Sequence, residues 1–243
     1  MKTPNPIHRD RHAGFTRTEL FFAIVVVLVL VCFAIPVFRS FEPVRRPFLS
    51  LGCGKHIGTA MKYFAGDHEG KFPSTKLDGT PLGSADFSNR AFEQFLPKYS
   101  SKKLFFNKLS AWCRNPAKDK TAADATLLKH GQNDWIYVTG LSEKSDARWP
   151  LVATATASAT DLTYSKVTSA KGGVWGGTDA IVLYTDGSAK VERCMADPTD
   201  KTKTFPERPD KPGANLFIAT PVEISTIGRA EWLGTGRVIL APE

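Results

Sequence analysis

The sequence predicts an α+β protein, in which an N-terminal transmembrane helix is followed by a globular head of short helices and an antiparallel β-sheet. Residues 20–38 form an apolar run of nineteen residues without a charge. Two later stretches, 57–64 and 92–99, repeat apolar residues at helical spacing. Most of the remaining chain consists of short runs of β-branched and aromatic residues bounded by Gly, Pro, Asp and Asn, which is typical of strands.

The apolar run has the length of a membrane span. As a helix, residues 20–38 would extend roughly 28 Å at about 1.5 Å per residue, which matches the bilayer core. Apolar residues occupy every face, so the helix needs lipid or other helices around it. The small residues Ala13 and Gly14 precede the run, and no secretory cleavage site follows it. Cleavage after Gly14 would therefore remove residues 1–14 and keep the helix.

Glu19 is the carboxylate at the start of this span. A carboxylate facing the bilayer centre costs about 2.5 to 3.5 kcal/mol, so a partner is expected. Cleavage after Gly14 would create an α-amino group on Phe15, which is largely cationic at neutral pH. Phe15 and Glu19 are four residues apart and share a helix face. We expect them to pair within one chain or between neighbouring subunits, where pairing would set the axial register.

The sequence GFTRTEL before the apolar run resembles the type IV prepilin family, which includes the pseudopilins of type II secretion. The resemblance implies that prepilin peptidase cuts between Gly14 and Phe15 and that Phe15 is then N-methylated. It assigns assembly and register to Glu19 and a helix kink to Pro36. It also implies a pilin-like head, and assembly with other pilin-like subunits on the inner-membrane platform into a type II secretion or type IV pilus-like filament.

The same resemblance implies a single-pass protein of the inner membrane, with its N-terminus in the cytoplasm and its head in the periplasm. The count of Lys and Arg on the two sides of the span is nearly balanced and does not orient it. An alternative is a signal-anchored periplasmic binding protein that is not assembled into a filament. A DNA-uptake pilus subunit is a third hypothesis.

A second resemblance covers residues 53–73. With Tyr63, Asp67, Gly70 and Pro73, this stretch is similar to the segment after the membrane helix in large pseudopilin-like proteins common in planctomycetes and verrucomicrobia. In that group a late apolar strand runs into Asp-Gly, as residues 180–187 do here.

Pro43 and Pro47 predict that the first helix ends near Phe41, because proline removes a backbone donor and disfavours helix in the residue before it. The resulting division is a leader 1–14, a transmembrane and assembly helix 15–41, a Pro-interrupted linker 42–52, a head 53–196, a Pro/Lys-rich loop 197–213 and C-terminal strands 214–243. Within the head, Asp186-Gly187 predicts a β-hairpin with a type I′ turn.

Cysteines and acidic residues give no firm site. Cys53, Cys113 and Cys194 allow one disulfide in an oxidising compartment, but three free thiols fit equally well. Asp179 and Asp186 are candidate calcium ligands, although calcium needs six to eight oxygens in one place. No other metal or cofactor is expected.

The sequence does not predict an enzyme, because it lacks G-x-S-x-G, H-E-x-x-H and a phosphate-binding G-x-x-x-x-G-K-[ST]. The formal net charge is +8. The basic residues form no long run and no basic helix with interleaved aromatics, so nucleic-acid binding is not indicated.

Overall fold

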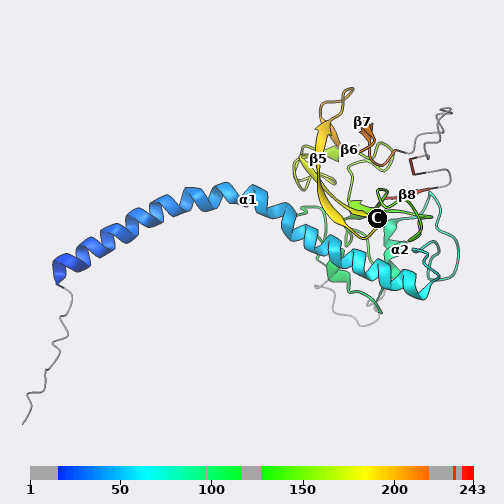
Figure 1. Ribbon diagram of the computed structural model, residues 1–243, viewed down its shortest axis with the longest axis horizontal. Helices are drawn as coiled ribbons and strands as arrows, with labels where there is room; N and C mark the ends of the chain where they lie inside the picture. The colour runs from blue at the N-terminus through cyan, green and yellow to red at the C-terminus, as the bar shows by residue number, and fades with distance from the viewer. Residues whose placement is uncertain (1–15, 97, 116–126, 219–231, 234–236) are drawn as a thin grey trace, which may run out of the picture. The chain divides into compact units, whose positions relative to one another are not determined.

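The computed structural model describes residues 16–96, 98–115, 127–218, 232–233 and 237–243 (Figure 1). The chain divides into two compact units, Met1–Val44 and Arg45–Glu243. The helical elements are α1 (Arg17–Asp67), α2 (Ser88–Glu93) and the short 3-10 helix η1 (Lys102–Leu104). The strands are β1 (Trp135–Val138), β2 (Pro150–Thr154), β3 (Tyr164–Ser165), β4 (Asp179–Tyr184), β5 (Ala189–Ala196), β6 (Lys203–Arg208), β7 (Lys211–Asn215) and β8 (Ile239–Leu240).

Helix α1 is longer than the sequence predicts. It runs from Arg17 to Asp67, so the expected end near Phe41 is wrong and the expected linker 42–52 is helical. Each proline removes one N–H donor and biases the preceding residue away from helix, but neither effect forbids a helix. The amphipathic stretch 57–64 is consequently the last part of α1 and not a separate helix.

The last part of α1 packs against the sheet through the apolar stripe that the sequence predicts. Ile57, Met61 and Phe64 are buried in the core. Two glycines bring the helix backbone close to β4: a Cβ at Gly58 would lie 2.7 Å from Leu183 Cδ1, and a Cβ at Gly54 would lie 3.3 Å from Ile181 Cγ2. The helix can approach this closely because both positions lack a side chain.

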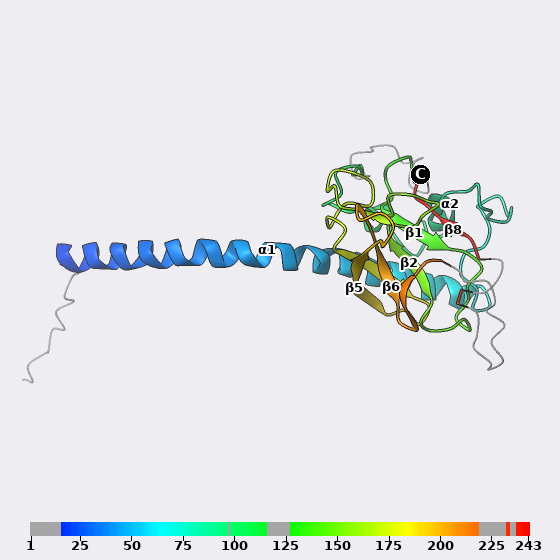
Figure 2. The same ribbon diagram turned by 90° about the horizontal axis from the view of Figure 1, so that it is seen from above.

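The sheet is antiparallel throughout, with the strand order β3-β6-β5-β4-β2-β1-β8 and with β7 paired to β6. Its middle strands are fully enclosed: every residue of β1 and β2 is buried, and so are the last five residues of β4. In both views the cyan end of α1 lies beside the sheet (Figures 1 and 2). An apolar helix and a curled antiparallel sheet with few other helices make the protein α+β, as predicted.

The hairpin of β4 and β5 is confirmed, but its predicted turn type is wrong. Gly187 has a φ of 84°, whereas Asp186 is not among the residues with positive φ. Gly187 N donates to Tyr184 O at 2.9 Å, and Tyr184 N donates to Ser188 O at 2.8 Å. The connection is a three-residue loop that ends in a left-handed glycine, which needs only one residue with positive φ.

The predicted Pro/Lys-rich loop 197–213 is also corrected, because it contains β6 and most of β7. Thr204, Phe205 and Pro206 of β6 are buried, and their partners in β5 are Ala196, Met195 and Cys194. Proline, lysine and aspartate predict exposure, but pairing with β5 supplies the backbone partners that a loop would lack. Of the strands expected in 214–243, the described residues contain the end of β7 and the two residues of β8.

Candidate functional site

The segment Arg17–Pro36 is the first candidate for function. Its 20 residues have a mean hydropathy of 2.9, and none of this apolar stretch is buried by the described part of the chain. Large side chains are left open, among them Phe22 at 63 % and Phe33 at 70 % exposure. The helix is long and apolar enough to cross a membrane. An all-apolar exposed helix is stable only where lipid or other helices surround it.

A reciprocal pair of polar residues begins this helix. The backbone N and the Oγ1 of Thr16 both donate to Glu19 Oε2 at 2.8 Å. In return, Glu19 N donates to Thr16 Oγ1 at 3.3 Å. This is a capping box, which satisfies N–H groups that have no partner within the helix. Glu19 also lies in the first helical turn, where the helix dipole favours negative charge.

Thr16 is therefore a partner of Glu19 that the sequence reasoning missed. Its signal was present in the sequence, because Thr16-Arg17-Thr18-Glu19 has the T-x-x-E spacing of a capping box before an apolar run. Gly14 and Phe15 lie outside the described residues, so the pairing of Glu19 with the Phe15 amine stays a prediction. Pro36 lies within α1, which continues past it.

The four cysteines are free thiols in the structure, so of the two alternatives for Cys53, Cys113 and Cys194 it has the one without a disulfide. Burial raises the pKa of the Cys53, Cys113 and Cys194 thiols, that of Cys113 to about 12. Thiolates are the reactive form, so these residues are weak nucleophiles at neutral pH.

The calcium candidates do not come together. Asp179 opens β4 and Asp186 lies in the loop beyond its end, which separates them by about 20 Å at roughly 3.4 Å per residue. Asp179 Oδ2 accepts from Thr178 Oγ1 and Asp186 Oδ1 accepts from Ser188 N, both at 2.7 Å. No group of three or more His, Cys, Asp or Glu residues suited to a metal occurs among the described residues.

Asp67, the last residue of α1, is tied to the segment after α2. Asp67 Oδ2 accepts from Lys98 Nζ at 2.7 Å and from the Tyr99 hydroxyl. These hydrogen bonds lower the pKa of Asp67 and raise that of Lys98. The carboxylate therefore anchors the end of α1 to the segment after α2.

A buried polar network joins distant parts of the head. Asn133 Nδ2 donates to Asn89 Oδ1 at 3.0 Å and to Ser88 Oγ at 2.8 Å. Asn89 Nδ2 donates to Leu128 O at 3.1 Å, while Glu243 N donates to Asn89 Oδ1 at 3.2 Å. Because these amides are satisfied by protein groups, the network fixes α2, β1 and the C-terminal residues to one another. Its role is structural.

Asp134, next to this network, is a buried carboxylate. Neither carboxylate oxygen makes a hydrogen bond of normal geometry with a described residue, and the same holds for Asn107 Nδ2 and Trp112 Nε1. Burial raises the pKa of Asp134 to about 7, against a smaller lowering by the facing Asn107, Trp112 and Lys171. Lys171 lies over the Trp112 ring at 4.9 Å and donates to Pro242 O at 2.6 Å.

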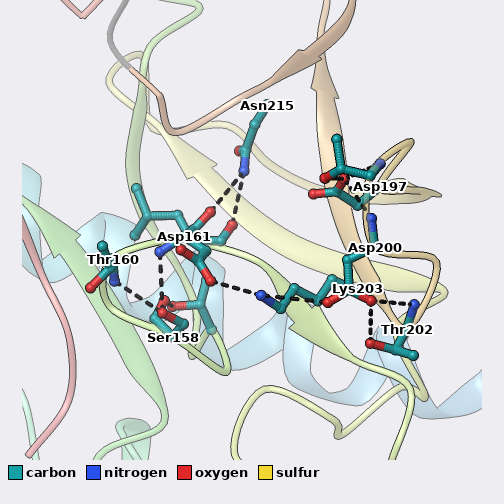
Figure 3. Close-up of polar contacts among 11 residues, drawn as sticks. Ser158, Thr160, Asp161, Asp197, Asp200, Thr202, Lys203 and Asn215 are labelled. Atoms are coloured by element: carbon teal, nitrogen blue, oxygen red, sulfur yellow. Dashed lines mark hydrogen bonds and ion pairs between the residues drawn. The ribbon is translucent and has the colours of Figure 1, made fainter.

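A surface cluster of polar contacts links the loop at residues 158–162 to β6 and β7 (Figure 3). Lys203 Nζ lies 2.9 Å from Asp161 Oδ2 and 3.6 Å from Asp200 Oδ2. Asn215 Nδ2 donates to Leu162 O at 3.0 Å. The ion pairs are partly exposed and contribute little to stability. The cluster fastens a loop to the sheet and is not arranged as a catalytic or metal site.

Two of the cavities that open on the described part of the head bear on function. One, of about 720 Å³, lies beside the β4–β5 loop and is lined by charges of both signs, including Arg148, Lys190, Glu192 and Glu207. The other, of about 540 Å³, lies between α1 and the segment after η1.

Comparison of the chain with protein-family models, with curated proteins and with solved structures gives no match.

Proposed function

We propose that this chain is a pilin-like structural subunit, processed by prepilin peptidase and assembled through its N-terminal helix into a type II secretion or type IV pilus-like filament. The observation that supports the proposal is the exposed apolar helix Arg17–Pro36, which begins with a carboxylate held in a polar cap. A plain membrane anchor needs the apolar helix, but it does not need the carboxylate.

Assembly would move this helix from lipid into a bundle of like helices. Moving the helix from lipid into a bundle removes little apolar surface from water. Close packing and polar contacts between the helices therefore determine whether the subunits associate. In the membrane, Thr16 satisfies Glu19 within the same chain. In the filament, Glu19 would pair with a Phe15 amine, and a misregistered subunit would leave a charge without a partner.

We propose a placement in the membrane for each part of the chain. The leader 1–14 and the cleavage site at Gly14 and Phe15 face the cytoplasm, the helix spans the inner membrane and the head lies in the periplasm. The partners are the prepilin peptidase, other pilin-like subunits and the inner-membrane assembly platform. The proposed role is structural and involves no chemical reaction of the head.

N-terminal sequencing and intact-mass measurement of the membrane-extracted protein test this proposal. The expected chain begins at N-methylated Phe15. Gly14→Leu should retain the leader, whereas the matched control Ala13→Ser should be cleaved as in wild type. A wild-type chain that retains Met1 would contradict the proposal.

The second candidate is a signal-anchored periplasmic binding protein. The cavity of about 720 Å³ beside the β4–β5 loop favours it, because both charge signs in its lining could hold a polar ligand. An intact N-terminus, together with a monomeric protein in the membrane, would select this candidate.

A further inference from the structure

The cavity of about 540 Å³ between α1 and the segment after η1 is lined by apolar residues, by lysines and by uncharged polar residues. Phe106, Leu109 and Cys53 supply apolar surface and are partly buried. Lys103 and Lys108 supply two exposed ammonium groups. Among the described residues of the lining there is no Asp or Glu. The volume falls in the range of about 300 to 1,000 Å³ that is usual for small-ligand sites.

Hydrogen bonds hold the polar part of the cavity wall in place. Asn107 is buried, and its Oδ1 accepts from Ser50 Oγ at 3.2 Å and from Leu109 N at 3.1 Å. The bond from Ser50 connects α1 to the segment that carries both lysines, and the bond from Leu109 N holds the Asn107 side chain within that segment. The cavity is therefore preformed, which lowers the ordering cost of binding.

Both lysines line the same cavity as the apolar side chains. Lys108 and Cys53 line the same cavity, and the charge of Lys108 opposes the rise that burial causes in the pKa of Cys53. A ligand that fits this lining has an apolar body and a single anionic head. The described residues of the lining include no acidic side chain that would repel such a head.

We infer that this cavity binds a long-chain fatty carboxylate, with its head between Lys103 and Lys108 and its chain against Phe106 and Leu109. The membrane that would hold the apolar span Arg17–Pro36 is a source of such a molecule. The site goes beyond the proposed function and does not depend on filament assembly.

Photolabelling of the full chain in phosphatidylcholine nanodiscs tests this site. The probe is a fatty acid with a diazirine near its methyl end, and the crosslinked peptides are mapped by mass spectrometry. Labels should map to residues 50–53 and 103–109, and dodecanoate should compete for them. Dodecanol, which lacks the charge, and inorganic phosphate, which lacks the chain, should not compete.

Lys103→Ala/Lys108→Ala should reduce labelling of these peptides at least fivefold, whereas the matched control Lys55→Ala, an exposed lysine of α1 outside the lining, should not change it. Labelling within Arg17–Pro36 reports equal probe loading in every sample. The inference is overturned if labels occur only in that span, if dodecanol competes as well as dodecanoate, or if the double variant labels normally. If dodecanoate does not compete and the label is lost only at high protein density, the inference is also overturned, because the cavity is then covered by a second copy of the chain.

Discussion

At the scale of single residues, Glu19 has one role in the structure and a second role that we propose. Its hydrogen bonds with Thr16 cap α1, and this needs no cleavage and no second subunit. A pair with the Phe15 amine would be formed only after processing. A capped carboxylate is also less costly to place at the membrane surface than one without partners.

The assembly role of Glu19 predicts a selective defect. Glu19→Ala should leave membrane insertion and cleavage intact, because the apolar run is unchanged, but it should impair filament incorporation. Crosslinking or pull-down of neighbouring subunits measures this. Thr18→Val, one residue away, is the control and should be incorporated normally. Normal incorporation of Glu19→Ala would refute the pairing.

Asp134 predicts a pH dependence. Burial raises its folded-state pKa from 3.8 to about 7, so the folded protein binds this proton more tightly than the unfolded chain does. Its contribution to stability is complete below about pH 4 and is lost as the pH rises through about 7. The loss is at most about 4 kcal/mol, at roughly 1.4 kcal/mol per pKa unit.

Thermal melts of wild type and Asp134→Asn between pH 5 and 8 measure this effect. The melting temperature of wild type should fall relative to that of the variant as the pH rises. Glu69→Gln, which removes an exposed carboxylate, is the control and should follow wild type. Parallel curves for Asp134→Asn and wild type would show that this carboxyl is not protonated in the folded protein at neutral pH.

At the scale of elements, α1 shows that two prolines do not by themselves end a helix. Two prolines predicted a break, and the structure has one helix from Arg17 to Asp67. Part of its length is held by the core, where Ile57, Met61 and Phe64 are buried. Burial of three such side chains is worth several kcal/mol, which stabilises the helix over residues 57–64.

The contact between α1 and β4 predicts opposite effects for two glycines of the same helix. In Gly58→Ala the new methyl group would lie 2.7 Å from Leu183 Cδ1, so the side chain must shift. We expect a net loss of about 1 kcal/mol in the free energy of unfolding, since overpacking typically costs about 1 to 3 kcal/mol and alanine favours helix.

Gly66→Ala is the matched variant, because nothing lies within 4 Å of its added Cβ. It should stabilise the protein by about 0.5 to 1 kcal/mol through helix propensity alone. Thermal or denaturant unfolding of both variants measures the difference. Equal shifts in the same direction would show that α1 does not rest closely on β4.

At the scale of the whole molecule, a few buried amides join segments that are far apart in the chain. Asn89 contacts residues 39 to 154 positions away, namely Leu128 and Asn133 before β1 and Glu243 among the C-terminal residues. Sequence periodicity does not report such contacts, because they depend on which elements the fold brings together.

Asn89→Ala should consequently destabilise the head by about 2 to 4 kcal/mol, since it leaves more than one buried polar group without a partner. Ser100→Ala, at an intermediate surface position, is the control and should change stability by less than about 0.5 kcal/mol. Denaturant unfolding of the full chain in detergent measures both. If Asn89→Ala is as stable as wild type, water takes the place of the Asn89 amide as the hydrogen-bond partner of the buried groups.

The sequence by itself determined the membrane-length helix, the helical stripe at 57–64 and the β4–β5 hairpin, because these rest on local periodicity and composition. Tertiary structure decided the conversion of 197–213 into paired strands and the burial of Asp134. These depend on distant partners, and a contact between distant segments leaves no periodic trace in either one.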